Sequence, residues 1–201
     1  MHSEDYIREK TGLLLLDPYN DFLSPTGKVW PQAKEIAEEV NLLSNLKSIV
    51  DAARQAGVRI FIVPHHRWEP ADYEHWKYPT PRQLKGAEIR VFEKGSWGGD
   101  WHPDFIPQEG DIIIKEHWGS SGFANTDLDF QLKQYGIDKI ILIGMLANTC
   151  IEATGRFGTE LGYHVTLVKD ATAAFSRECP VEGTPSANPT RAGHEKQNGV
   201  R

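Results

Sequence analysis

The sequence contains few cysteines and lacks any long apolar segment, and both features limit what the protein can be. Only 2 of the 201 residues are cysteine, Cys150 and Cys179, which argues against a disulfide-stabilised secreted domain and fits a reducing compartment. No stretch approaches the roughly 18 apolar residues that a membrane helix needs, and residues 1–10 contain no apolar signal core. We therefore expect a cytoplasmic protein that makes no contact with a membrane.

The sequence also lacks an excess of positive charge. It has 22 Lys and Arg against 28 Asp and Glu, a formal net charge of −6, and the basic residues are scattered along the chain. Proteins that bind nucleic acids or anionic lipids usually carry a basic patch or arm. The composition therefore gives no reason to expect a nucleic acid or an anionic lipid as the main partner.

Short apolar runs alternate with segments of helical periodicity along the chain. The runs are continuous, which is typical of strands that are buried on both faces. The predicted strands are 12–17, 58–63, 111–115, 139–144 and 163–170, and the predicted helices are 32–57, 128–135 and 149–162. This order predicts a three-layer α/β/α fold whose mostly parallel sheet is covered by helices on both faces.

Two segments depart from this alternation. The connection 64–110 is long and rich in Trp, His, Pro and Gly, with a short helix expected around 82–89. Loops of this length in compact domains are usually functional or disordered, and the aromatic content favours a wall of the active site. Residues 179–201 carry three prolines and almost no large apolar side chain, which predicts a flexible tail after one domain at 1–178.

Three reactive side chains follow predicted strands. Asp17 ends the first strand, Lys115 ends the 111–115 strand, and Cys150 begins a helix after the 139–144 strand. Ligands of open α/β sheets bind beyond the carboxyl ends of the strands, so we expect the three groups to meet there. Lys115 would favour the thiolate of Cys150, the nucleophile, while Asp17 would transfer protons as general acid and base.

Each of these residues also has an ordinary structural explanation. A cysteine at the start of an apolar helix is often inert core, and an aspartate after a strand is often a turn residue. A lysine at a strand end is usually a solvated surface charge. It is their joint position at one edge of the predicted sheet that favours catalysis.

Four segments of the chain carry a family pattern. In chain order they are DPYNDF from Asp17, IIIKEHWGSSGFANTDL around Lys115, GMLANTCIEAT around Cys150, and VKDATAA from Val168. They resemble D-x-Q-N-D-F, K-x-x-x-S-x-F-x-x-T-x-L, G-x-x-T-x-x-C-V-x-x-T and V-x-D-A-x-A of the isochorismatase-like hydrolases, a family of cysteine hydrolases. The resemblance covers about residues 12–178.

The resemblance implies a sheet of five to six strands and a catalytic triad of Asp17, Lys115 and Cys150. It also implies a cis peptide bond between Met145 and Leu146, with the N–H groups of Leu146 and Cys150 forming the oxyanion hole. Tyr19 departs from the family pattern, which often has Gln there.

The end of the sequence is the second departure from the family. The family normally continues with another helix and a last edge strand, whereas here the chain runs into the predicted tail. Either the sixth strand is missing, or a partner or the tail replaces it. An uncovered sheet edge favours association, so we expect a homo-oligomer, either a dimer or a tetramer.

Aromatic side chains are expected to line a flat, largely apolar pocket, although several could instead pack the long loop onto the core. The candidates are Phe22, Trp97, Trp101, Trp118 and Phe123. His66 or Arg82 would orient a substrate carboxylate. The nicotinamidase branch of the family holds a metal through an Asp and several His, but residues 64–67 (PHHR) lack its D-x-H spacing. We therefore expect no metal and no cofactor, with a divalent metal as the alternative.

The function that these residues favour is hydrolysis of a small amide, ureido or carbamoyl compound through a thioester on Cys150. Two alternatives stay open at the level of sequence. One is hydrolysis of the vinyl ether of isochorismate in the same pocket, which needs an acid such as Asp17 but no covalent nucleophile. The other is a catalytically inactive interaction or effector protein, which the altered C-terminal segment would suit.

Overall fold

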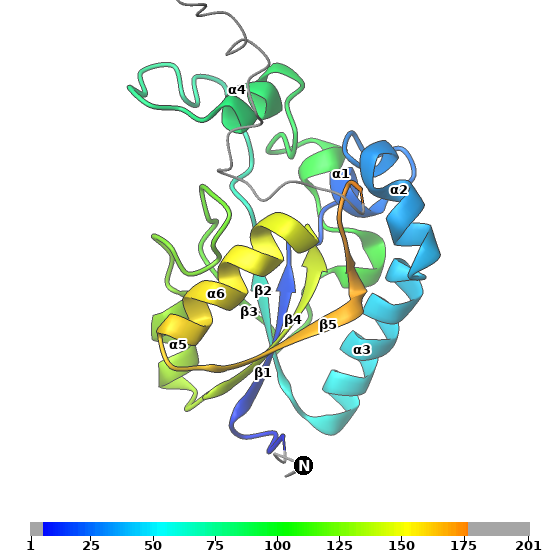
Figure 1. The fold of residues 1–201 in the computed structure, drawn as a ribbon, viewed down its shortest axis with the longest axis vertical. Coiled ribbons are helices and arrows are strands. Elements are labelled where there is room, and N and C mark those ends of the chain that lie inside the picture. The colour runs from blue at the N-terminus through cyan, green and yellow to red at the C-terminus, as the bar shows by residue number, and fades with distance from the viewer. Residues whose placement is uncertain (1–5, 177–201) are drawn as a thin grey trace, which may run out of the picture.

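Five parallel strands form the middle layer of the molecule (Figure 1). The computed structural model describes residues 6–176, and their sheet has the order β3-β2-β1-β4-β5. The strands are β1 Thr11–Leu16, β2 Arg59–Val63, β3 Ile112–Ile113, β4 Lys139–Met145 and β5 His164–Ala173. The predicted α/β/α fold with a parallel sheet is therefore confirmed, while the tail predicted at 179–201 lies outside the described residues.

The central strand β1 is buried on both faces. Its backbone pairs with β2 and β4, so that Leu14 lies opposite Phe61 on one side and Leu142 on the other. Successive side chains of a strand point to opposite faces. Leu13 and Leu15 accordingly belong to one apolar cluster and Leu14 and Leu16 to a second.

Helices cover both clusters and complete the three layers (Figure 1). One face is covered by α2 (Trp30–Glu39) and α3 (Leu42–Ala56), and the other by α5 (Leu128–Gln134) and α6 (Glu152–Glu160). The buried leucines of α3 join the cluster of Leu13, and those of α5 join the cluster of Leu14. Burial of these apolar faces holds the sheet in place.

The helix predicted at 32–57 is two helices. They meet at Asn41, whose backbone has φ +52°, a left-handed conformation that asparagine tolerates better than most residues. The side-chain amide of Asn45 donates to the carbonyl of Val40 at 2.7 Å, which satisfies a backbone acceptor at the break. Because the apolar periodicity continues across Asn41, the sequence pattern does not reveal the break between the two helices.

The long connection 64–110 folds over the carboxyl ends of the strands. It contains the predicted short helix as α4 (Pro81–Glu88), which begins with a capping box between Thr80 and Gln83. The short helix α1 (Asn20–Leu23) ties the connection to β1, because the buried carboxylate of Asp21 accepts from the N–H of Phe92 at 2.8 Å. In Figure 1, α1 and α4 both lie at the end of the sheet toward which the strands point.

The structure bears only in part on two expectations, that the protein forms a homo-oligomer and that it makes no contact with a membrane. Strand β5 lies at the edge of the described sheet and exposes Leu167, while the expected homo-oligomer stays a prediction. Within residues 6–176, no helix is both long enough and apolar enough to cross a membrane.

Gly144 allows the ends of β1 and β4 to approach closely. Its φ is +117°, and a Cβ atom there would lie 2.2 Å from the carbonyl oxygen of Leu16. Gly136 provides a matched control, because its φ is +67° and nothing lies within 4 Å of a Cβ placed on it.

We expect Gly136→Ala to lower the free energy of unfolding by about 1 kcal/mol, the cost of left-handed backbone alone. Gly144→Ala should cost more than about 3 kcal/mol, because a backbone collision adds to that strain. Urea denaturation of both variants measures the difference. Equal losses would show that close approach at Gly144 does not constrain the fold.

Candidate active site

The candidate site lies where the order of the strands reverses. From β1 the chain proceeds to β2 and β3 on one side of the sheet, and later to β4 and β5 on the other. Ligands of open α/β sheets bind at this switch point, beyond the carboxyl ends of the strands. Asp17 directly follows β1, and Cys150 lies in the short helix η3 (Ala147–Ile151) that follows β4.

A third residue, His117, completes a buried group with Asp17 and Cys150. One potential ligand atom from each residue, an oxygen, a nitrogen and a sulfur, lies within 4.8 Å of the other two. The exposed fractions are 0% for Asp17, 0% for His117 and 4% for Cys150. The three elements of the sheet edge thus bring an acid, a base and a thiol together out of contact with bulk water.

Backbone contacts fix Asp17 and His117 relative to each other. The N–H of Asp17 donates to the carbonyl of Val63 at 3.1 Å, and the N–H of His117 donates to the carbonyl of Pro64 at 2.9 Å. The backbone of both residues is therefore hydrogen-bonded to the carboxyl end of β2. Asp17 itself has φ +53°, a left-handed conformation that costs free energy and is frequent at functional sites.

The hydrogen bonds of His117 define where its protons lie. Its Nδ1 is 2.6 Å from the carbonyl oxygen of Gly119, which only accepts, so Nδ1 carries a proton. Its Nε2 is 3.1 Å from Oδ1 of Asp17, and two lone pairs could not face each other at that distance. One further proton is therefore held between His117 and Asp17.

The electrostatics favour the ion pair as the form of this contact. Burial alone lowers the pKa of His117, but the charge and hydrogen bond of Asp17 outweigh it and raise the pKa above its ordinary value of about 6.5. Burial and the nearby His117 lower the pKa of His65 to about 4, so His65 is neutral near pH 7. The ring centroids of the two histidines are 5.0 Å apart, and the positive charge of this pair therefore lies on His117.

Cys150 is protonated in the resting protein. Burial raises the pKa of its thiol well above the usual range, and the nearby Asp17 carboxylate raises it further, while Thr149 and Arg82 act in the opposite direction. Oδ2 of Asp17 is buried and has no hydrogen-bond partner. This oxygen is available to accept the thiol proton, so the arrangement suits general-base activation of the sulfur.

The structure corrects the prediction that Lys115 joins this group. Lys115 is exposed, and its backbone N–H donates to Oδ1 of Asp127 at 2.8 Å. The position beside Asp17 is taken by His117 instead. The spacing of the family pattern could have revealed this, since four residues before Ser121 of the S-x-F segment stands His117, whereas Lys115 stands six residues before it.

The turn before Cys150 has the backbone feature that the resemblance implies. The peptide bond between Met145 and Leu146 is cis. The carbonyl of Leu146 accepts from the N–H groups of Thr149 and Ile151 at 3.2 and 3.1 Å. An oxyanion hole formed by the N–H groups of Leu146 and Cys150 stays a prediction.

The aromatic residues expected to line a pocket are mostly packed against other rings. Trp101 stacks on Tyr19 with ring centroids 5.0 Å apart, and Phe22 meets Phe92 edge-on at 4.7 Å. Tyr19, which stands where the family often has Gln, is itself fully buried and donates to the carbonyl of His65. These contacts explain the two aromatic residues as core, so their role in substrate binding stays a prediction.

The other expected pocket residues differ in exposure. Phe123 is buried between the rings of Phe157 and Tyr163, whereas Trp97 is 51% exposed. Trp118 stacks on His66 with ring centroids 3.6 Å apart. Exposure makes Trp97 the residue of this set that is most accessible to a ligand.

Asp17, His117 and Cys150 also form the one group among residues 6–176 whose donor atoms are close enough to hold a metal ion. Both ring nitrogens of His117 are already engaged, one by Gly119 and one by Asp17. A metal would have to displace the Asp17 contact to reach Nε2. The hydrogen bonds therefore fit a proton-transfer group better than a metal site.

Comparison with known proteins agrees with this geometry. The sequence model of the isochorismatase domain matches residues 11–186. The chain belongs to the isochorismatase family. Its members share the fold described above and include hydrolases, and this protein is a hydrolase of that family with a small-molecule substrate.

Three proteins illustrate what the chain is similar to. The ureidoacrylate amidohydrolase RutB of Pantoea ananatis is 28% identical over 174 residues, which cover 82% of this chain and 69% of that protein. A cysteine hydrolase from Pseudomonas syringae pv. phaseolicola has 29% identity and a TM-score of 0.68, with 84% of this chain and 74% of that chain covered. The N-carbamoylsarcosine amidase of Thermoplasma acidophilum has 26% identity and a TM-score of 0.61, with coverages of 82% and 84%.

Substitution at residues 115 and 117 distinguishes the predicted cation from the observed one. We expect His117→Gln to lower kcat/KM by about 10²-fold or more, because the charge beside Asp17 is lost. Lys115→Gln should leave kcat/KM unchanged, because its side chain is exposed. The reverse pattern would return the catalytic role to Lys115.

The pH dependence provides a second check on His117. Because its pKa is raised by Asp17, the positive charge persists below that pKa and is lost as the pH rises through it. We expect activity to fall on that alkaline side. His117→Lys should move the fall to higher pH, since an ordinary lysine titrates at about 10.4, and an unmoved profile would exclude His117 as its source.

Proposed function

We propose that this isochorismatase-family hydrolase cleaves a C–N bond of a small amide or ureido compound through a thioester on Cys150. The observation that carries the proposal is the sulfur of Cys150 beside a buried carboxylate whose Oδ2 has no hydrogen-bond partner. An oxygen in that position can accept the proton that the thiol must lose before the sulfur attacks a substrate. Relatives named ureidoacrylate amidohydrolase and N-carbamoylsarcosine amidase support the bond type.

In the acylation step the sulfur attacks the substrate carbonyl carbon while Asp17 takes the thiol proton. The tetrahedral intermediate then expels the amine, which leaves with the proton that Asp17 returns. The N–H groups of Leu146 and Cys150 are the proposed donors to the oxyanion. Water next attacks the thioester, Asp17 again takes a proton, and the thiol is restored as the acyl group leaves.

In these steps His117 supplies a positive charge beside Asp17. Its imidazolium faces Oδ1 of Asp17, and Oδ2, which has no hydrogen-bond partner, accepts the thiol proton. A fixed positive charge in a site without bulk water stabilises developing negative charge more strongly than it would in water. This is the task that the family pattern gives to a lysine.

Arg82 is a better candidate than His66 to orient a substrate carboxylate. Its charge acts on Cys150, lowering the pKa of the thiol, and its guanidinium lies 5.9 Å from the ring centroid of Phe175, beyond the end of β5. His66 lies against two protein carboxylates, Asp72 and Glu116. A third carboxylate there would be repelled.

The two alternatives have less support. Hydrolysis of the isochorismate vinyl ether would use Asp17 as an acid and leave the sulfur of Cys150 without a task. An inactive interaction protein would leave the buried group of Asp17, His117 and Cys150 unexplained, since burying charged side chains without a function costs stability.

Acyl-enzyme trapping tests the proposal. Incubation with a panel of ureido and N-carbamoyl acids, followed by acid quench, should give a mass adduct on the peptide that contains Cys150. Cys150→Ser should abolish the adduct and lower the release of ammonia by at least about 10³-fold, because a serine hydroxyl is the weaker nucleophile here.

The companion assay measures pyruvate released from isochorismate. Full turnover of any amide substrate by Cys150→Ala would reject the thioester mechanism. Pyruvate release without an adduct would instead favour the vinyl ether reaction.

A further inference from the structure

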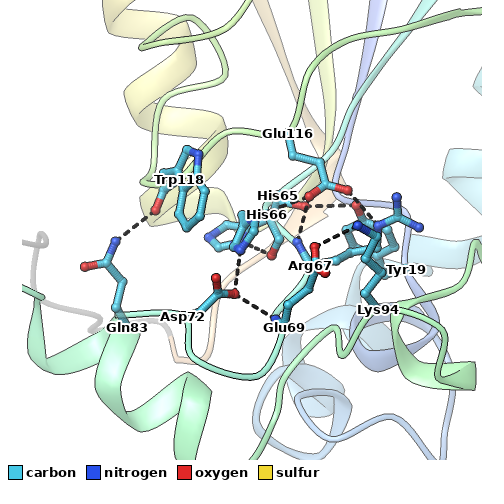
Figure 2. A network of polar contacts seen from close by, with 10 residues as sticks. All are labelled: Tyr19, His65, His66, Arg67, Glu69, Asp72, Gln83, Lys94, Glu116 and Trp118. Atoms are coloured by element: carbon cyan, nitrogen blue, oxygen red, sulfur yellow. Dashed lines mark hydrogen bonds and ion pairs between the residues drawn. The ribbon is translucent and has the colours of Figure 1, made fainter. Parts of the chain in front are cut away.

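His66 lies at the centre of a polar network (Figure 2) that includes Glu116 and Trp118, the chain neighbours of His117. Its Nε2 is 2.7 Å from Oδ2 of Asp72, and its Nδ1 is 3.3 Å from Oε2 of Glu116. Its side chain is only 9% exposed. Both ring nitrogens therefore face carboxylates in a largely buried position.

This geometry requires a charged ring. A carboxylate oxygen only accepts hydrogen bonds, so each of the two nitrogens must carry a proton to face one favourably. The electrostatics agree, because burial lowers the pKa of His66 but Glu116 and Asp72 outweigh it and raise the pKa overall. Burial likewise raises the pKa of Glu116, yet His66 and Arg67 bring it down to about 2.

The network contacts the residues directly before and after His117, which are Glu116 and Trp118. On one side, Glu116 accepts from the backbone N–H of Arg67 at 2.9 Å and from its Nε at 2.6 Å, in addition to facing His66. On the other side, Trp118 stacks on His66 with ring centroids 3.6 Å apart and an interplanar angle of 19°. Figure 2 shows Glu116 and Trp118 both directed toward His66.

Further contacts anchor this assembly to the long connection. The side-chain amide of Gln83, in α4, donates to the carbonyl of Trp118 at 3.0 Å. Asp72 also accepts from the N–H of Glu69, whose carboxylate pairs with Lys94 at 2.7 Å. The N–H of His66 itself donates to the carbonyl of His117 at 2.9 Å.

We propose that His66 is a positioning residue for His117, acting as a charged clamp that binds both neighbours of the catalytic histidine in one orientation. The inference deepens the proposed function, on which the catalytic role of His117 rests. It also reassigns His66 and Trp118, which the sequence suggested as substrate-binding residues. A displacement of about 1 Å of a catalytic group can cost about 10²-fold in rate, so a clamp of this kind affects catalysis without touching the substrate.

The test compares His66→Gln with His75→Gln, an exposed histidine of the same connection. A glutamine amide can donate to only one of the two carboxylates and does not stack on Trp118 as a charged ring does. We expect kcat to fall by about tenfold or more in His66→Gln while KM stays within about twofold. His75→Gln should match the native protein in both parameters.

Two measurements that need no substrate accompany the kinetics. In ¹⁵N-histidine NMR, the Nδ1–H signal of His117, bonded to Gly119, should broaden or shift in His66→Gln and stay unchanged in His75→Gln. The rate at which iodoacetamide alkylates Cys150 should change in the same variant, since the alkylation reports the proton acceptor beside the sulfur.

Asp72→Asn provides a second variant if His66→Gln does not fold. It keeps the size of the side chain and removes one of the two charges that face His66, so a smaller loss of kcat and the same direction of NMR change are expected. An unchanged kcat and an unchanged His117 signal in folded His66→Gln or Asp72→Asn would overturn the clamp. A response of the His117 signal without any amide hydrolysis in the native protein would instead support the clamp and reject the proposed function.

Discussion

The proton held between His117 and Asp17 is the interaction on which the site depends. Both side chains have no exposed surface, and Nε2 lies 3.1 Å from Oδ1. A buried carboxylate or imidazolium alone would be costly, because each would lose its hydration without compensation. Facing each other, they leave Oδ2 of Asp17 without a hydrogen-bond partner, and this is the oxygen that the proposed mechanism uses to accept the thiol proton of Cys150.

The rest of the structure keeps this pair in place. The strand order reverses between β1 and β4, and Gly144 allows the two strand ends to approach. The long connection is held near the pair by the hydrogen bond from the N–H of Phe92 to Asp21 and by the contacts of His66 with Asp72 and Glu116. In the proposed function His117 takes the role of the family's lysine, and an imidazole has a shorter reach than a lysine and loses its charge at lower pH.

The candidate site shows where pattern matching succeeds and where it fails. Asp17 and Cys150 lie at the expected end of the sheet, because the first directly follows β1 and the second lies in the short helix after β4; their catalytic roles stay predictions. Lys115 matches the residue type of the family pattern, whereas the spacing to Ser121 fits His117. The two positions differ by two residues, and in the irregular backbone after β3 that shift takes a side chain from the protein surface to full burial.

The pocket residues were harder to predict for a different reason. An aromatic residue in a long loop can face a ligand or another aromatic ring, and both uses have the same composition. Trp101 stacks on Tyr19, and Trp118 on His66, through contacts between segments far apart in the chain. No local signal distinguishes such a contact from a binding surface.

The sequence by itself determined the fold class, because continuous apolar runs separated by helical periodicity leave few arrangements that bury both. It also determined which thiol and which carboxylate stand at the end of the sheet, since that depends only on where strands end. The tertiary structure decided which basic group lies beside this thiol and this carboxylate. It also decided that His66 contacts two carboxylates of the protein itself. Those outcomes depend on which side chains from distant segments come within hydrogen-bonding distance, and that distance is set by packing.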